Sequence, residues 1–153
     1  MKATIAAGLL ERWLGPIESI RAEVPYGLNR RSRIDLLLTP SAANADTRPI
    51  YLEVKNTTWT DGDLALFPDT VTERGQKHLV ELTALLPSAR AVLVPCLSRA
   101  DVVRFAPGDQ ADRRYGELFR QALDAGVEVL PCVYSFSATA IHWLGLAAVQ
   151  NRS

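Results

Sequence analysis

Three short apolar segments, residues 18–24, 33–39 and 50–56, follow one another before the first long helical pattern. They restrict the fold more than any other feature of the chain. The first alternates apolar and polar residues with a period of two, which is typical of a strand. A polar stretch, residues 40–49, separates the second from the third and predicts a hairpin. We therefore expect three neighbouring antiparallel strands near the start of one sheet.

The rest of the chain alternates between helical and strand-like patterns. Thr70 and Glu73 match a capping box that opens a helix ending before Pro87. A long connection with a turn at Asp61-Gly62 precedes that helix. Further predicted elements are a helix over 2–13, a buried strand over 90–97, a helix over 112–125 capped by Gly126, a buried strand over 127–133 and an edge strand over 140–145. This order predicts an α/β fold with a mixed β-sheet flanked by helices.

The length and composition fit one domain. The chain has 153 residues, of which 48% are hydrophobic and 22% charged, as in ordinary globular proteins. We expect residues 1–153 to form a single domain. Lysine and arginine together number 17, as do aspartate and glutamate, so a global basic signature for nucleic acid is missing. That counts only mildly against nucleic-acid binding, because a local patch such as Arg30, Arg31 and Arg33 can suffice.

The two cysteines and the hydropathy pattern indicate the cellular compartment in which the protein works. Cys96 and Cys132 each follow a proline at the end of an apolar run and lack the spacing of a zinc site. We expect both to be reduced, buried and near neighbours. No secretory signal and no segment long enough to span a bilayer are evident, which predicts a cytoplasmic protein without a membrane partner.

The most informative stretch is Leu52-Glu53-Val54-Lys55. Residues two apart in a strand point the same way, so Glu53 and Lys55 share one face while Leu52 and Val54 face the core. If the hairpin loop is centred near Asn44, Asp35 lies opposite Glu53. Opposed residues of neighbouring strands have Cβ atoms about 4.5–5.5 Å apart.

Two carboxylates this close repel each other unless a cation or a proton lies between them. Oxygen ligands suit Mg²⁺, and Lys55 would stand beside the metal to orient or help deprotonate an attacking water. The metal lowers the pKa of that water and stabilises the transition state of phosphodiester hydrolysis. The alternative is plain: a Glu and a Lys alternating on one strand also describe any solvated sheet face, and spacing alone does not separate the two readings.

Three segments carry a resemblance to a known family: Ser32-Arg33-Ile34-Asp35-Leu36-Leu37-Leu38, Tyr51-Leu52-Glu53-Val54-Lys55-Asn56, and the long stretch from Ala65 to Leu79. They resemble the sugar fermentation stimulation protein A family, from about residue 3 to about residue 145. The resemblance implies a restriction-endonuclease-like PD-(D/E)xK nuclease fold, with DNA binding or cleavage and a link to maltose-gene regulation. It also implies that Asp35 and Glu53 bind Mg²⁺ or Mn²⁺ and that Lys55 is the catalytic lysine.

The chain departs from the family pattern at its start. Full-length members begin with an OB-like domain of about eighty residues, a single-strand-binding platform. This chain starts where that domain should have ended, so we expect no OB-like domain in it.

Each of the other candidate site residues has a functional and a purely structural interpretation. Glu23 matches an acidic position of the family and is a candidate third metal ligand, or a plain exposed strand residue. Gln76 is a candidate contact to metal-bound water or phosphate, or a plain exposed helix residue. Arg33, Arg74 and Lys77 are candidate phosphate contacts, or solvated surface charges. His78 and His142 lie far apart in sequence and are expected to serve surface or core packing. The tryptophans are expected to be core or rim residues, except that Trp59, in the loop beside the strand that carries Glu53 and Lys55, is a candidate stacking platform.

The expected function is divalent-metal-dependent hydrolysis of phosphodiester bonds in DNA, or alternatively RNA. A second hypothesis is a DNA-binding regulatory protein of the same fold that does not cut, and a third is a structural module. Glu53 and Lys55 are expected to be dispensable for folding, because their face is expected to be an open cleft.

Overall fold

The computed structural model describes residues 1–27 and 30–151. Its helices and strands alternate in the predicted α/β manner, with more strands than the sequence patterns indicated. In chain order they are α1 (Lys2–Ala6), α2 (Glu11–Leu14), β1 (Ile17–Tyr26), β2 (Ser32–Pro40), β3 (Ile50–Thr57), β4 (Trp59–Asp61), β5 (Leu64–Phe67), α3 (Glu73–Ala84), β6 (Arg90–Leu97), β7 (Arg104–Pro107), α4 (Arg113–Ala125), β8 (Glu128–Val129), β9 (Cys132–Phe136), β10 (Ile141–Leu146) and β11 (Ala148–Val149).

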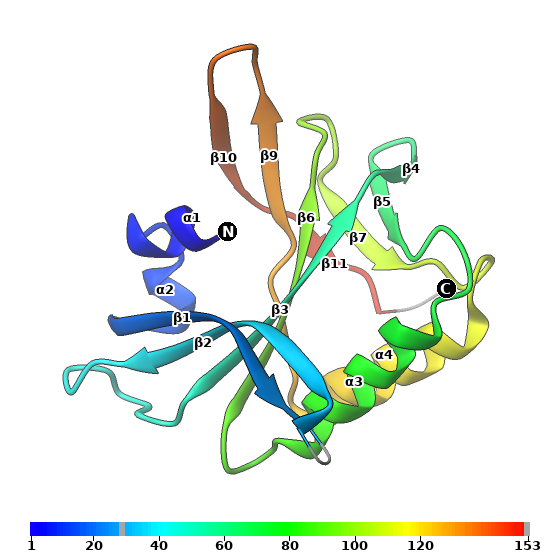
Figure 1. The fold of residues 1–153 in the computed structure, drawn as a ribbon. Coiled ribbons are helices and arrows are strands. Elements are labelled where there is room, and N and C mark those ends of the chain that lie inside the picture. Colours follow the sequence, from blue (N-terminus) through cyan, green and yellow to red (C-terminus); the bar gives the residue numbers. More distant parts are fainter. Residues whose placement is uncertain (28–29, 152–153) are drawn as a thin grey trace.

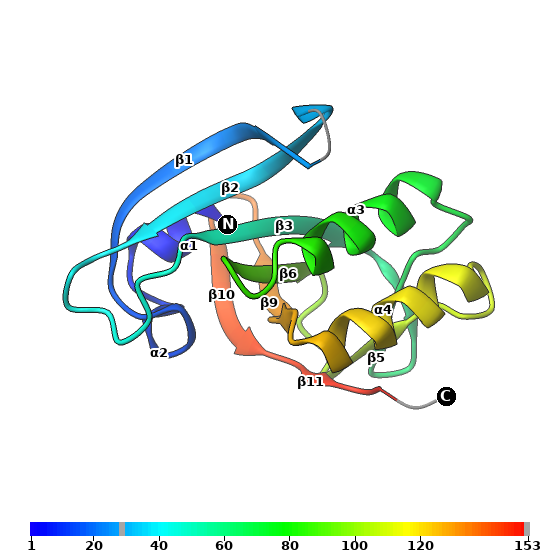
Figure 2. The same ribbon diagram turned by 90° about the horizontal axis from the view of Figure 1, so that it is seen from below.

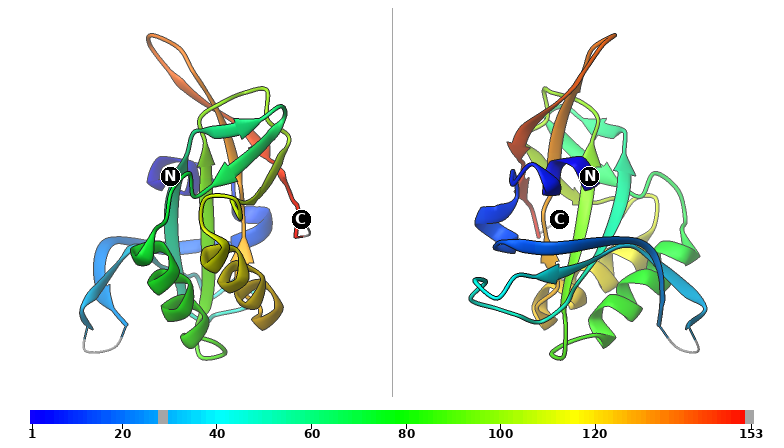
Figure 3. Two further views of the ribbon diagram at one scale, coloured as in Figure 1. Left: turned by 90° about the vertical axis from the view of Figure 1, so that its right-hand side faces the viewer. Right: turned by 60° about the vertical axis from the view of Figure 1, so that its left-hand side comes forward.

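The main sheet is mixed, as predicted, with strand order β1-β2-β3-β6-β9-β10 and β8 paired to β6 (Figure 1). The first three strands are antiparallel neighbours, which confirms the expected meander. Strands β3, β6 and β9 run parallel, since helices connect them. The last strand, β10, pairs antiparallel with β9. These two form a hairpin that extends beyond the rest of the molecule (Figure 3).

A second sheet of four strands, in the order β11-β7-β5-β4, was not predicted. The connection over 57–69, expected to be a loop, contains the hairpin β4–β5 with its turn at Asp61-Gly62. These strands have two to four residues each, too few for a periodic pattern. They are held by parallel pairing of β5 and β11 to β7, which lies about forty residues from its partners in the chain.

Two apolar cores lie on opposite faces of the main sheet. Helices α3 and α4 lie side by side on one face, and α1 and α2 lie on the other (Figure 2). The α3–α4 side is filled by residues such as Leu79, Phe105 and Phe119, and the α1–α2 side by residues such as Leu10 and Leu52. Because both faces are covered, the polar residues of the central strands have little access to solvent.

The start of α3 differs from the predicted capping box. The cap is Thr72, whose Oγ1 accepts a hydrogen bond from the Gly75 amide at 3.1 Å, and Thr70 lies outside the helix. The reason is tertiary: Asp112, which caps α4, also accepts from the Thr72 amide at 2.9 Å. This contact ties the starts of the two helices together and moves the cap two residues along. The predicted C-terminal cap of α4, Gly126, is confirmed, and Asp112, predicted as the first helical residue, is its N-cap.

Two further predicted elements are interrupted. The helix expected over 2–13 is two short helices separated at Gly8, whose φ of 73° favours glycine. The strand expected over 127–133 is divided into β8 and β9 on either side of Pro131. Proline lacks the amide hydrogen that a central strand needs for its ladder.

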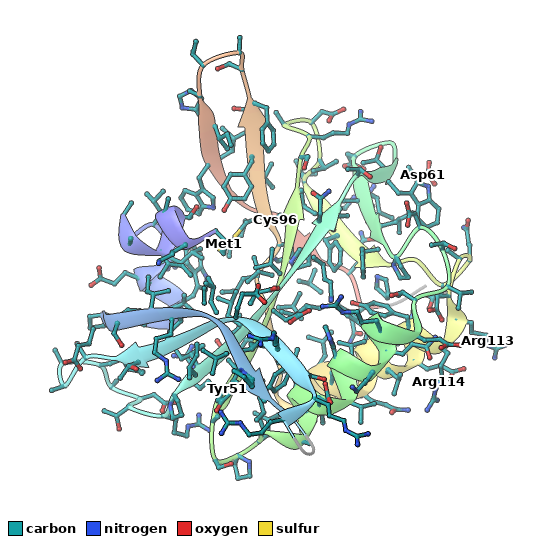
Figure 4. The ribbon with its side chains drawn as sticks, viewed as in Figure 1. Met1, Tyr51, Asp61, Cys96, Arg113 and Arg114 are labelled. Carbon is teal, nitrogen blue, oxygen red and sulfur yellow. The ribbon has the colours of Figure 1, made fainter. Side chains whose placement is uncertain are left out.

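The two cysteines are free and face each other across the parallel pair β6–β9, as predicted. Cys132 is buried, whereas Cys96 is only half-buried, so full burial was wrong for one of them. Cys96 lies on the same side of the sheet as Met1 (Figure 4). Burial raises the pKa of the Cys132 thiol to about 12, which keeps it protonated. Over residues 1–27 and 30–151, no helix has the length and apolar character needed to cross a membrane.

Candidate functional site

The site is set by a short ladder between β2 and β3. Only three pairs join these strands: Leu36 with Leu52, Leu37 with Tyr51, and Leu38 with Ile50. Continuing this register by one step places Asp35 opposite Glu53, as expected from the hairpin. The strands separate at that step, and Asp35 Oδ2 accepts a hydrogen bond from the Val54 amide at 2.6 Å. The side chain of Asp35 thus takes the amide that a continuing ladder would have used.

Glu53 faces α3 and is only 3% exposed. Its Oε1 lies 2.7 Å from Lys55 Nζ and 2.5 Å from His78 Nδ1. Its Oε2 is buried and has no hydrogen-bond partner among the described residues. The expectation of an open cleft at Glu53 was therefore wrong, because α3 closes over it. Lys55, with a side-chain exposure of 13%, lies nearer the surface.

The two carboxyl groups differ in their acidity. Burial acts to raise the pKa of Glu53, but the hydrogen bond from His78 and the charge of Lys55 outweigh it, so the pKa is lowered. Burial also raises the pKa of Asp35, and the Val54 amide opposes this only in part. The charge of Glu53 adds to the upward shift. Glu53 is thus held ionised, while Asp35 is the less compensated of the two.

Two tyrosines near Glu53 were not predicted from the sequence to be part of the site. Tyr26, at the end of β1, and Tyr115, in the first turn of α4, are both buried, and neither hydroxyl has a partner among the described residues. Burial raises the pKa of each, and the charge of Glu53 raises it further. Both hydroxyls therefore remain protonated beside the carboxylate. No local pattern identifies them, since they meet Glu53 only through the docking of distant elements.

Glu23 lies opposite Asp35 in β1, between the pairs Ala22–Leu36 and Val24–Ile34. Its φ is 53°, an uncommon conformation for a residue other than glycine. Its carbonyl accepts from Arg33 Nη1 at 2.9 Å. Its charge contributes to the raised pKa of Asp35. Even so, in the described part of the chain no three His, Cys, Asp or Glu side chains converge to hold a metal, so Glu23 does not complete a three-ligand set with the acidic pair.

A pocket of about 590 Å³ lies between β1, β2 and α3, and its lining residues do not include Asp35, Glu53 or Lys55. It brings together Arg33, Arg74 and Lys77, three of the four residues expected to contact nucleic acid. His78 also lines it, with Glu23, Arg31, Ser32 and Glu73. The fourth expected residue, Gln76, is bound elsewhere: its Nε2 donates to both carboxylate oxygens of Asp112, at 3.0 and 2.9 Å. The side chain of Gln76 is thus turned toward α4, and its contact to metal-bound water or phosphate stays a prediction.

The fold and the site together define a mixed α/β protein with an acidic pair and a lysine on two neighbouring strands of its main sheet. Residues 1–140 match the family model described as "Sugar fermentation stimulation protein RE domain". The chain belongs to the sugar fermentation stimulation protein family, which confirms the resemblance carried by the sequence segments.

Curated relatives agree with this membership. The chain is 72% identical over 150 residues to the sugar fermentation stimulation protein homolog of Synechococcus sp. (strain CC9605), covering 98% of this chain and 59% of the relative. It is 73% identical over 151 residues to the homolog of Parasynechococcus marenigrum (strain WH8102), covering 99% of this chain and 59% of the relative. The chain thus spans about three fifths of the length of the curated relatives it matches.

A solved structure shares the fold. It is described as "The structure of Pyrococcus Furiosus SfsA in complex with Ca2+", and it matches with a TM-score of 0.84 at 29% sequence identity. The match covers 96% of this chain and 61% of that protein. The α/β architecture described above is therefore the architecture of this family.

Proposed function

We propose that this chain is a restriction-endonuclease-like nuclease domain that hydrolyses phosphodiester bonds of DNA, or alternatively RNA, with a divalent metal. The observation that carries the proposal is the group formed by Asp35, Glu53 and Lys55, in which Glu53 Oε2 is buried and unpartnered among the described residues. A buried carboxylate oxygen without a partner costs free energy unless a ligand satisfies it. The pocket lined by arginine and lysine also contains His78, which contacts Glu53, and it suits a phosphate backbone.

The residues fit a hard divalent cation. Asp35 and Glu53 would hold it, with Glu53 contributing its free Oε2 and water completing the coordination. Mg²⁺ and Mn²⁺ suit a site with one or two carboxylates, and the Ca²⁺ named for the relative from Pyrococcus furiosus also prefers oxygen ligands. When bound, the metal supplies Lewis-acid stabilisation of the phosphate and a more acidic water.

The remaining groups act on the substrate. Lys55 is paired with Glu53, and its ammonium must leave that carboxylate to approach a phosphate oxygen. There it would offset negative charge that develops during hydrolysis. Arg33, Arg74 and Lys77 would hold neighbouring phosphates and fix the register of the strand. Such contacts carry little sequence information, so the pocket favours binding to the backbone over recognition of bases.

The second candidate is a DNA-binding regulatory protein that does not cut. The closed Lys55–Glu53–His78 arrangement under α3 favours it, since a lysine held at 2.7 Å by a buried carboxylate is not yet available to a phosphate. Both candidates use the same arginine and lysine pocket. They differ only in whether Lys55 and the acidic pair are needed for a chemical step.

A cleavage assay with single-stranded and duplex DNA and RNA, with Mn²⁺, Mg²⁺ or chelator, separates the two. Lys55→Ala should lower cleavage by about 10²-fold or more, as expected for a group acting in the transition state. It should leave metal binding intact or tighter, because a nearby positive charge is removed. The matched control is Lys2→Ala, an exposed lysine on the opposite face of the sheet. Equal cleavage by Lys55→Ala and the parent contradicts the proposed site, and binding without any cleavage favours the regulatory candidate.

A further inference from the structure

Among the described residues, His78 is the one residue of α3 that forms a hydrogen bond with the carboxylate of Glu53. His78 as a whole residue is 3% exposed, and its Nδ1 lies 2.5 Å from Glu53 Oε1 and 3.2 Å from Lys55 Nζ. A bare Nδ1 would place its lone pair against a carboxylate oxygen at this distance. Nδ1 therefore carries the proton and donates to Glu53. Two donors, one from α3 and one from β3, thus converge on the same oxygen.

The arrangement of these two donors also determines the surroundings of the other carboxylate oxygen of Glu53. Because both donors occupy Oε1, Oε2 is left buried and unpartnered among the described residues. A partial rotation of the carboxylate about its last χ angle would move the free oxygen from its place, and the hydrogen bond from the buried imidazole on the docked helix restricts that rotation. Lys55 is less able to do so, since its long side chain is partly exposed.

We infer that His78 is a positioning residue, which holds Glu53 with Oε2 free for a divalent cation and keeps it oriented when Lys55 leaves for the phosphate. The inference rests on the proposed function. It gives His78, expected from the sequence to serve packing only, a defined role through Glu53. It also explains why a titratable side chain is buried at this turn of α3, where an apolar residue would fill the space without donating a hydrogen bond.

Metal binding provides the first test, because it requires no substrate. Asn and Leu have similar shapes, and the amide of Asn can donate from near the position of Nδ1, whereas Leu cannot. Titration calorimetry with Ca²⁺ should show His78→Leu binding about 10- to 100-fold more weakly than the parent, the usual cost of removing a partner that orients a metal ligand. His78→Asn should bind within about threefold of the parent. Thermal unfolding of both variants checks that each is folded.

A second test uses the unaltered protein and stands even if a variant fails to fold. The chain has two histidines, and His142 is exposed on β10. With ¹⁵N-labelled histidine, Ca²⁺ should shift the imidazole nitrogen signals of His78 and leave those of His142 in place. The reason is that a cation at Oε2 withdraws electron density from Oε1 and weakens its hydrogen bond to Nδ1.

The outcomes separate the inference from the proposed function. If Asp35→Asn and Glu53→Gln abolish Ca²⁺ binding while His78→Leu binds as tightly as the parent, the positioning role is refuted and the metal site remains. An unchanged His78 signal at saturating Ca²⁺ refutes it in the same way. If the parent binds neither Ca²⁺ nor Mn²⁺, the metal site of the proposed function is wrong, and the role of His78 falls with it.

Discussion

At the scale of single residues, the two central carboxyl groups are treated differently by their surroundings. Glu53 receives hydrogen bonds from Lys55 and His78, and its pKa is lowered despite burial. Asp35 receives one amide hydrogen bond, and burial and the neighbouring acid raise its pKa. Pairs of titratable groups whose environments drive their pKa values apart are common in active sites. The pair is therefore electrostatically prepared for a cation, with Asp35 gaining most from one.

This difference predicts how Asp35→Asn affects stability. A carboxyl whose folded pKa is raised contributes stability below its unfolded pKa, about 3.9, and loses it as pH rises through the folded pKa. Ionised Asp35 thus destabilises the metal-free protein at pH 7. Asp35→Asn keeps an oxygen for the Val54 amide and should raise the Tm by a few degrees at pH 7, with the gain vanishing near pH 3. Thermal unfolding with chelator present measures this.

Glu53→Gln is the opposing control in the same experiment. The pKa of Glu53 is lowered, so its stabilising contribution is present above the unfolded pKa, about 4.3, and is lost as pH falls through the folded pKa. This variant should have a lower Tm than the parent at pH 7, since Lys55 and His78 lose their ionised partner. A lower Tm for Asp35→Asn at pH 7 contradicts the assignment of Asp35 as the uncompensated acid.

The acidic pair and Lys55 could be placed from the sequence because their geometry is local. A two-residue period and one hairpin register are sufficient to bring Asp35 opposite Glu53. His78, Tyr26 and Tyr115 could not be found in this way. His78 contacts Glu53, and the two tyrosines lie near enough to feel its charge, only because α3, the end of β1 and α4 dock against the sheet. Such docking leaves no periodic signal in the chain.

At the scale of elements, the start of α3 shows how a tertiary contact overrides a local motif. Thr70 and Glu73 have the spacing of a capping box, yet Thr72 is the residue that caps. Asp112 holds the Thr72 amide, and Gly75 permits the close approach, because an added Cβ would lie 2.7 Å from the Thr72 methyl group. The helix that carries His78 is thus positioned by α4.

Two threonine variants distinguish the two cap positions. Thr72→Ala should destabilise the protein by about 1 kcal/mol, the usual loss for an N-cap hydroxyl, or roughly 2–4 °C in Tm for a chain of this size. Thr70→Ala should change stability by less than about 0.5 kcal/mol, as an exposed substitution outside the helix. Thermal or denaturant unfolding of the pair checks this, and a larger loss for Thr70→Ala restores the predicted capping box.

The elements that the sequence did not indicate share one property, which is short length. Strands β4, β5, β7 and β11 form a sheet only by pairing across long separations in the chain. Long strands such as β1 and β6, in contrast, were predicted closely, because eight or more residues establish a pattern. The mixed main sheet was therefore predictable, and the second sheet was not.

At the scale of the whole molecule, the balance of charges means that any attraction for nucleic acid comes from a local patch. The net charge is zero, so the molecule has little long-range attraction for a polyanion. The pocket between β2 and α3 gathers arginine and lysine from two separate segments of the chain. Lys77 Nζ forms an ion pair with Glu81 Oε1 at 3.6 Å. The Lys77 side chain is 53% exposed, so this ion pair is weak.

A double variant tests whether this patch binds the backbone. Arg74→Ala with Lys77→Ala should weaken binding about equally for different sequences and reduce the slope of log K against log salt by about 2, one for each phosphate contact. Lys2→Ala with Arg12→Ala removes the same charges from α1 and α2, on the opposite face, and should leave the slope unchanged. Fluorescence anisotropy over a salt series measures both. Equal slopes for the two double variants place nucleic acid elsewhere on the molecule.

The three-pair ladder between β2 and β3 also sets where the chain tolerates changes in length. It fixes the alignment of Asp35 with Glu53, together with the hydrogen bond from the Val54 amide to Asp35, whereas the loop over 41–49 returns the chain and is anchored by Asn44 to the Leu14 carbonyl at 2.9 Å. An insertion in the loop beyond Asn44 leaves the alignment intact. One residue inserted within 36–38 or 50–52 would slide the strands and turn one carboxylate to the other face. Insertions and deletions accepted during the evolution of this domain should therefore occur in the loop and not among the six residues of the three ladder pairs.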